Sequence, residues 1–257
     1  LFLLLTLFTL YRFGKSRGDE YTGLLAAVLF LGNPVVLLEG CLAYVDIAYA
    51  WFFLMGAWYM LAAGENEGDR RLYLLLAGIS AGMLAGIKLT GWFAVFALAA
   101  LYVLTARRGR VQSAIRNPQS AISRFALYFL LPGIALSLPW FIKSWYYTGN
   151  PVYPFLHEWF GGPYWSTTLS EQLRAWHRLT GMGRGLTDYL LLPIRVILFG
   201  GQGYDRFDGT LNPVWILLLP LAIFGGRRDP FIRRLLFTGL VYFLFWAATS
   251  QQMRFLI

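Results

Sequence analysis

Two apolar runs, Ile47–Ala63 (IAYAWFFLMGAWYMLAA) and Leu72–Lys88 (LYLLLAGISAGMLAGIK), follow one another with only the polar stretch GENEGDRR between them. A helix that crosses the hydrocarbon core of a bilayer needs about 20 mainly apolar residues, and fewer where neighbouring helices permit. Each run is close to that length, so each is expected to form a spanning helix. The pair predicts a helical membrane protein rather than a soluble globular domain.

The composition of the whole chain supports this prediction. Of the 257 residues, 58% are hydrophobic and 14% are charged, whereas soluble domains average about 25% charged residues. A chain this apolar would leave more hydrophobic surface than a single core can hide in water. Trp and Tyr residues also stand at the ends of apolar runs, where their rings favour the lipid headgroup level; these are Tyr11, Trp140, Trp145 and Trp246.

About eight spans are predicted by the same length rule, and together they make residues 1–257 a single polytopic, all-α transmembrane bundle. The first and last apolar runs reach the ends of the sequence, so we expect an internal fragment of a longer protein. The expected spans are 1–12, 22–39, 47–63, 72–88, 91–106, 125–142, 212–226 and 235–249.

One long segment, 143–211, is too long for a simple turn and is expected to form an outer-face loop region. It contains the polar stretch STTLSEQLRAWHRL, expected to be helical with a start at Ser170 and Glu171, and the apolar stretch DYLLLPIRVILFG. The apolar stretch has the length of an interfacial or re-entrant helix rather than of a span.

The net charge of +9 comes from basic residues gathered in the connections between apolar runs. With the eight spans above, four basic connections fall on the same side, which the positive-inside rule makes cytoplasmic. A nucleic-acid partner is therefore not expected. The four groups are Arg12, Lys15 and Arg17; Arg70 and Arg71; Arg107, Arg108, Arg110, Arg116 and Arg124; and Arg227, Arg228, Arg233 and Arg234.

Four ionisable residues lie at the opposite, outer ends of the predicted spans: Glu39, Asp46, Lys88 and Lys143. Charges placed within or beside apolar runs are costly and mark functional sites by default. We expect them to converge on one outward-facing cavity, with the acids as bases and the lysines as contacts for a phosphate. The simpler interpretations are that both lysines reach to the membrane interface, that Asp46 caps a helix, and that Glu39 is an interface residue.

The string TGNPVYPF, Thr148–Phe155, predicts a rigid turn just outside the membrane because it holds two prolines three residues apart. It is either a stiff loop or a wall of a substrate groove. Arg254 in TSQQMRF either binds phosphate or marks the interface. No metal-ligand spacing is present, and a divalent metal ion is left open as a cofactor. A single cysteine, Cys41, excludes an internal disulfide.

Four strings in order resemble the integral-membrane glycosyltransferases of the GT-C superfamily, from about Asn33 to the end of the chain: AYVDIA, GIKLTG, PWFIKSWYYTGNPVYPF and TSQQMRFLI. Within that superfamily, the strings are most similar to bacterial protein O-mannosyltransferase-like and aminoarabinose-transferase-like members. The specificity of the resemblance lies in the order and membrane placement of the strings, since no single motif is diagnostic.

The resemblance implies an enzyme that moves a sugar from a polyprenyl-phosphate donor to a lipid, glycan or protein acceptor on the outer face of a bacterial inner membrane. It matches Asp46 to a second acid of the family and makes Lys88 and Arg254 contacts for the donor phosphate. Asn150 and Tyr153 would line the mouth of the site. The family's principal acid lies in its first outer loop, which this chain is expected to lack.

Three other interpretations stay open. A transporter or flippase of lipid-linked saccharides would share the outward cavity, but it normally carries broken helices and charges at mid-membrane. A glycan polymerase or ligase would use outer-face arginines such as Arg174, Arg178 and Arg184. A non-catalytic membrane scaffold would tolerate neutral residues at Asp46 and Lys88.

Overall fold

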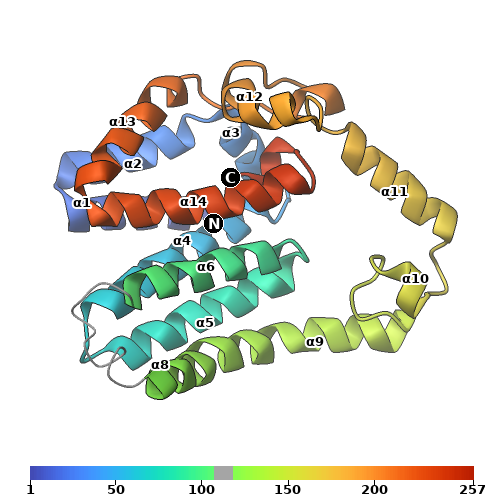
Figure 1. Cartoon of the computed structure of the whole chain (residues 1–257), viewed down its shortest axis with the longest axis horizontal. Helices are drawn as coiled ribbons and strands as arrows, with labels where there is room; N and C mark the ends of the chain where they lie inside the picture. The colour runs from blue at the N-terminus through green and yellow to red at the C-terminus, as the bar shows by residue number, and fades with distance from the viewer. Residues whose placement is uncertain (107–117) are drawn as a thin grey trace.

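The computed structural model describes residues 1–106 and 118–257, and the described part is built from helices without a strand (Figure 1). The prediction of an all-α fold is confirmed. The first half holds α1 (Phe2–Arg17), α2 (Glu20–Leu31), α3 (Pro34–Cys41), α4 (Asp46–Glu65), α5 (Arg70–Ile87) and α6 (Gly91–Ala106). The second half holds α8 (Pro118–Phe125), η1 (Ala126–Leu130), α9 (Leu131–Thr148), α10 (His157–Phe160), α11 (Thr167–Leu179), α12 (Leu186–Leu198), η2 (Tyr204–Arg206), α13 (Trp215–Arg228), α14 (Pro230–Ala248) and η3 (Met253–Phe255).

The predicted count of eight spans is too high for the helices that form. Four helices are long and apolar enough to cross a membrane, and a fifth span results if the bent pair α2–α3 counts as one. Helices form at the other predicted positions too, but α1 and α6 have 16 residues and α13 has 14. At about 1.5 Å per residue, such helices fall short of a hydrocarbon core about 30 Å thick. The four long helices are Asp46–Glu65, Arg70–Ile87, Ala121–Thr148 and Pro230–Ala248.

Glycines permit a close contact between α5 and the continuous helix formed by η1 and α9. A Cβ added at Gly78 would lie 2.5 Å from the carbonyl oxygen of Phe129, and one at Gly82 would lie 2.7 Å from that of Gly133. Only glycine therefore permits this approach of the two backbones. A Cβ at Gly86, further along α5, would meet nothing within 4 Å.

Two hydrophobic clusters form the core. The larger one lies among α4, α5 and α6 and includes Leu61, Leu84 and Leu98, which are completely buried. The second joins α3, α12 and the end of α14, through residues such as Val36, Leu192 and Trp246. This second cluster carries the C-terminal residues, including Met253, and so supports the candidate site described below.

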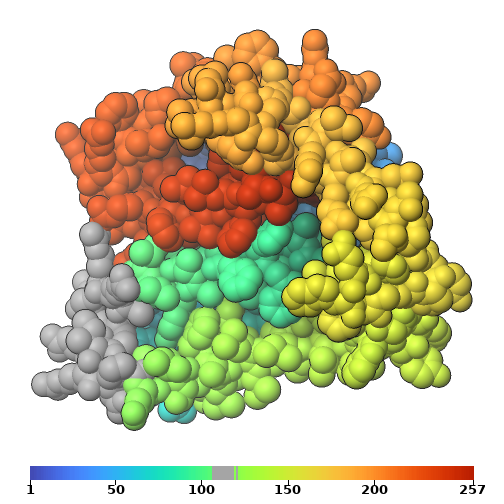
Figure 2. All heavy atoms as spheres, turned by 45° about the vertical axis from the view of Figure 1, so that its right-hand side comes forward, coloured from blue at the N-terminus to red at the C-terminus, as the bar shows by residue number. Residues whose placement is uncertain are grey.

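The two ends of the bundle differ in composition. The connections α1–α2, α4–α5 and α13–α14, which hold three of the predicted basic groups, lie at the same end, on the left in Figure 1. Arg107, Arg108, Arg110 and Arg116 of the remaining basic connection lie outside the described residues. The turns α3–α4 and α5–α6 lie at the other end, where α9, α10, α11 and α12 form an arc. Figure 2 shows that the surface is hollowed where α11, the C-terminal segment and the α5–α6 end meet.

The segment 143–211 differs in detail from its prediction. Helix α9 runs on to Thr148, so its last residues belong to the bundle helix rather than to a loop. Helix α11 begins after Ser166, whose side chain accepts a hydrogen bond from the Leu169 N–H at 3.1 Å, so the predicted start at Ser170 is wrong. A serine that caps a helix satisfies one of the free N–H groups of its first turn.

Candidate functional site

Two buried carboxyl groups lie where α3 gives way to α4. Glu39, in the last turn of α3, is 4% exposed, and Asp46, the first residue of α4, is 3% exposed. The N-cap position of α4 is occupied by Val45, and Asp46 is the first residue inside the helix. The interpretation of Asp46 as a helix cap is therefore wrong, since its carboxylate is directed to a different partner.

That partner is Lys88, in the turn between α5 and α6. The Lys88 Nζ donates to Asp46 Oδ1 in a short, charge-assisted hydrogen bond, and it lies 4.4 Å from the centroid of the Phe255 ring. The turn is tight because Gly91 follows, where a Cβ would lie 2.0 Å from the Leu84 carbonyl oxygen. The Lys88 side chain is 20% exposed, so it is largely buried in the cluster rather than extended to an interface.

Arg254 completes the cluster from the other end of the chain. It lies in η3, with its guanidinium carbon 5.2 Å from the ring centroid of Tyr44 and 5.0 Å from that of Phe255. Both Arg254 and Lys88 are close enough to attract the carboxylate of Glu39 electrostatically. We call these four residues (Glu39, Asp46, Lys88 and Arg254) the charged cluster.

The charged cluster holds polar atoms that remain without partners. Glu39 Oε2 and Arg254 Nε are buried and have no hydrogen-bond partner among the described residues. A buried polar atom without a partner costs about 1–3 kcal/mol. An acceptor and a donor left open in one cluster suit a ligand that brings both a hydroxyl group and an anionic oxygen.

Hydrogen bonds fix the C-terminal segment that carries Arg254. The Tyr242 hydroxyl donates to the Phe255 carbonyl oxygen at 2.8 Å, and the Trp246 Nε1 donates to that of Gln252 at 2.8 Å. The Gln252 Nε2 donates to Asp208 Oδ2 at 2.6 Å. No local pattern of the sequence indicates these contacts, because the partners are distant in the chain or lie beyond the predicted spans.

Three other predicted site residues do not join the charged cluster. Lys143 is exposed, with its Nζ 5.3 Å from the centroid of the Trp140 ring. Asn150 is completely buried, and its amide bonds within its own loop, to the carbonyl oxygens of Phe155 and Gly161 and the Val152 N–H. Tyr153 packs edge-on against Trp165. Asn150 therefore stabilises the TGNPVYPF loop.

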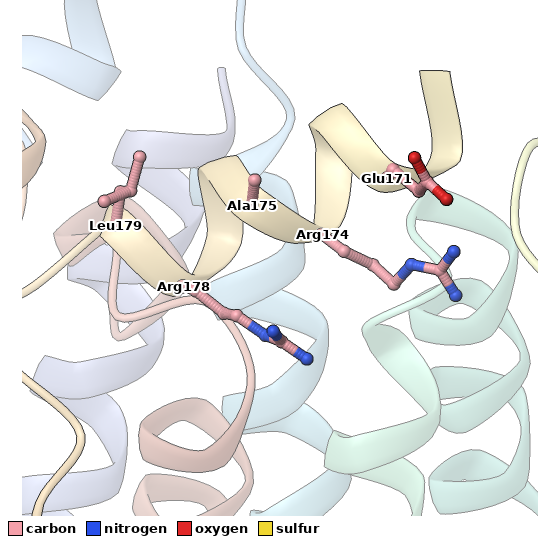
Figure 3. A pocket seen from close by; sticks show the side chains of 5 residues that line it. All are labelled: Glu171, Arg174, Ala175, Arg178 and Leu179. Carbon is pink, nitrogen blue, oxygen red and sulfur yellow. The ribbon is translucent and has the colours of Figure 1, made fainter. Parts of the chain in front are cut away.

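A hollow of about 400 Å³ borders one side of α11 (Figure 3). Arg174 and Arg178 extend from the same side of the helix. Arg174 forms an ion pair with Glu158 at 2.9 Å, whereas Arg178 has no ion pair in the described part of the chain. No group of three His, Cys, Asp or Glu side chains able to hold a metal ion occurs among the described residues. The hollow is lined by two basic residues, the acidic Glu171 and the apolar Ala175 and Leu179.

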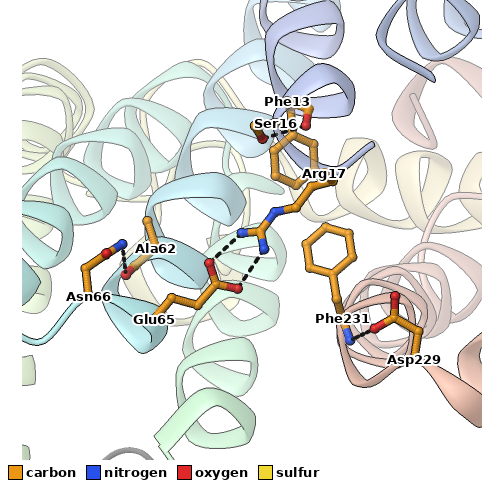
Figure 4. A network of polar contacts seen from close by, with 8 residues as sticks. All are labelled: Phe13, Ser16, Arg17, Ala62, Glu65, Asn66, Asp229 and Phe231. Atoms are coloured by element: carbon orange, nitrogen blue, oxygen red, sulfur yellow. Dashed lines mark hydrogen bonds and ion pairs between the residues drawn. The ribbon is translucent and has the colours of Figure 1, made fainter. Parts of the chain in front are cut away.

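The opposite end of α4 carries a different ion pair, shown in Figure 4. Arg17 donates to both carboxylate oxygens of Glu65, at 2.8 and 2.7 Å, and its guanidinium carbon lies 4.4 Å from the ring centroid of Phe231. This pair joins α1, α4 and α14. It gives α4 an ion pair at each end, only one of which belongs to the charged cluster.

Helices of this length and hydropathy, with a charged cluster at one end of the bundle, define a polytopic helical protein of the integral-membrane type. The chain belongs to the family described as a domain of unknown function (DUF8201), whose family model matches residues 1–257. No curated protein and no solved structure matches the chain.

Proposed function

We propose that this protein is a membrane glycosyltransferase that moves a sugar from a polyprenyl-phosphate donor to a lipid, glycan or protein acceptor. The observation that carries the proposal is the charged cluster, in which two buried carboxyl groups and two cations meet at one end of the bundle. The order of the four sequence strings that resemble GT-C enzymes supports it independently.

The charged cluster contains the groups that this reaction needs. A carboxylate, Asp46 or Glu39, would accept the proton of the acceptor hydroxyl as that oxygen forms a bond to the anomeric carbon of the sugar. The bond from that carbon to the phosphate oxygen breaks, and the polyprenyl phosphate leaves with both electrons. Lys88 and Arg254 would stabilise the negative charge on the departing phosphate.

The placement of charge supports a location for the reaction. The basic connections α1–α2, α4–α5 and α13–α14 lie at the end of the bundle away from the charged cluster. If these connections face the cytoplasm, as the positive-inside rule predicts, the cluster lies on the outer face. In bacteria that face of the inner membrane is periplasmic, and lipid-linked donors reach it through the bilayer.

The test is sugar transfer in membranes that contain the full protein, with a panel of radiolabelled polyprenyl-phosphate sugars. Asp46→Asn is compared with Glu65→Gln, which removes the ion pair at the other end of the same helix. We expect transfer from one donor, a loss of at least about 100-fold in Asp46→Asn, and near-native transfer in Glu65→Gln.

Two results would contradict the proposal. Equal losses in both variants would mean that α4 needs its ion pairs only to stay folded. Transfer from none of the donors, with the protein inserted and folded, would remove the enzyme assignment.

A second candidate, a transporter or flippase of lipid-linked saccharides, is favoured by one feature of the fold. Helices α2 and α3 are bent by 73° at the break around Gly32 and Asn33, as in a broken span or a re-entrant loop. Broken helices are common at the binding sites of transporters. Movement of a labelled polyprenyl-phosphate sugar across vesicles that contain the protein, without transfer of the sugar, would support this candidate over the enzyme.

A further inference from the structure

The guanidinium of Arg184, in the loop between α11 and α12, joins two parts of the molecule that are distant in sequence. Its Nη2 donates to the carbonyl oxygens of His177 at 2.8 Å and Thr180 at 3.3 Å, at the end of α11. Its Nη1 donates to that of Ala247 at 2.6 Å, and Nη2 also donates to that of Thr249 at 2.9 Å. Arg184 therefore binds the ends of α11 and α14 together.

The chemistry of this contact explains why an arginine occupies the position. The last carbonyl groups of a helix have no partner within the helix and carry partial negative charge. One planar guanidinium offers five N–H donors, so it can serve two helix ends at once, whereas the ammonium group of lysine offers three. Arg184 is thus committed to the backbone and is not free to bind a substrate.

A close backbone contact adds to this junction. Gly181 has a φ of +103°, and a Cβ there would lie 2.1 Å from Gln251 Oε1. Ser250, Gln251 and Gln252 are all buried, at 5%, 0% and 3% exposure. The loop after α11 therefore contacts Thr249 and Gln251, in the segment that leads from α14 to η3, and η3 carries Arg254.

We infer that Arg184 is a positioning residue, which fixes Arg254 in the charged cluster by holding residues 249–252 against the loop after α11. The placement of residues 249–252 against the loop after α11 follows from these contacts and does not depend on the proposed function. Its consequence for donor binding rests on the proposed function, because Arg254 is there assigned to the donor phosphate. Two measurements test the two parts separately.

The first measurement is the rate at which a membrane-impermeant maleimide labels a cysteine at position 250, in the full protein in membranes. Cys41, which is exposed, is first changed to serine. Ser250→Cys is a mild reporter, because the Ser250 hydroxyl is buried and has no hydrogen-bond partner among the described residues. We expect Arg184→Gln to raise the labelling rate at least about 10-fold, since the contacts of the loop after α11 with Thr249 and Gln251, on either side of position 250, would open.

The matched control is Arg195→Gln. Arg195 donates to the Met182 carbonyl oxygen at 2.8 Å and to Asp188 at 2.7 Å, within the same outer region, and neither hydrogen bond reaches residues 247–252. The labelling rate in this variant should stay within about 2-fold of the parent. An unchanged rate in Arg184→Gln, or an equal rise in Arg195→Gln, would overturn the inference.

A second pair of variants opens the same junction without a change of charge. Gly181→Ala must displace Gln251, whereas Gly161→Ala introduces a side chain at a similarly positive φ of +70° where nothing lies within 4 Å. We expect faster labelling at position 250 in Gly181→Ala only. This pair keeps the inference falsifiable if Arg184→Gln fails to fold, and equal labelling in the two alanine variants would contradict it.

The second measurement is the kinetics of sugar transfer. Misplacement of Arg254 should raise the KM for the polyprenyl-phosphate donor about 10-fold in Arg184→Gln, with a smaller change in kcat, and Arg184→Lys should restore part of the loss. Unchanged values of both KM and kcat in Arg184→Gln would overturn the link to the donor phosphate. If native protein transfers no sugar, the proposed function fails while the labelling result still decides the position of residues 249–252.

Discussion

The ion pair between Lys88 and Asp46 provides a test of the site that does not depend on its function. Lys88→Met would leave the Asp46 carboxylate buried, with its side chain 4% exposed, and without its cation. Removal of one partner from a buried pair costs about 3–5 kcal/mol, because the remaining charge is uncompensated. Lys88 is 20% exposed and Arg254 lies nearby, so we expect the lower limit, about 3 kcal/mol.

The double variant Lys88→Met/Asp46→Asn removes both charges and should recover most of this loss, to within about 1 kcal/mol of the native protein. For a chain of this size, about 3 kcal/mol corresponds to a fall in Tm of roughly 6–12 °C. The assay is thermal unfolding of the purified protein in detergent, followed by far-UV circular dichroism. A native Tm in the single variant, or a double variant as unstable as the single one, would refute the reasoning.

Three further predictions use the same unfolding assay. Gly82→Val should lower the Tm by several degrees because the valine side chain would meet the Gly133 carbonyl oxygen. Gly86→Val should leave the Tm unchanged, since nothing lies within 4 Å of a Cβ at that position. Equal effects of the two substitutions would contradict the close α5–α9 contact. Asn33→Ala should lower the free energy of unfolding by about 1–3 kcal/mol, since the buried Asn33 amide makes four hydrogen bonds, including one from Trp215 Nε1. A decrease of less than about 0.5 kcal/mol would be evidence against that role. Hydrogen bonds from Arg195 and the Gly185 N–H lower the pKa of Asp188. The stabilising effect of the Asp188 carboxylate should therefore be full near neutral pH and be lost as the pH falls through the lowered pKa, below about 4. If the native protein and Asp188→Asn still differed in Tm below that pH, the prediction would be wrong.

Several features of the fold could be predicted because they depend on neighbouring residues only. The runs 47–63 and 72–88 form α4 and α5, and each end lies within two residues of the expected one. The reason is that hydropathy over about one helix length decides whether a helix can be buried in lipid. The number of spans was less predictable. Helix α6 forms over the predicted run of 16 residues and α13 has 14, and both are shorter than a bilayer crossing needs.

The sequence by itself determined the helical class, the distribution of basic residues along the chain, and the position of Glu39, Asp46 and Lys88 at helix ends. Only the tertiary structure decided which charges share a site. Arg254 joins them because the chain after α14 folds back onto α3, whereas Lys143 stays apart at the end of a long helix. The physical reason is that electrostatic and hydrogen-bond energies depend on distance in space, which helix packing sets and which no local pattern of residues encodes.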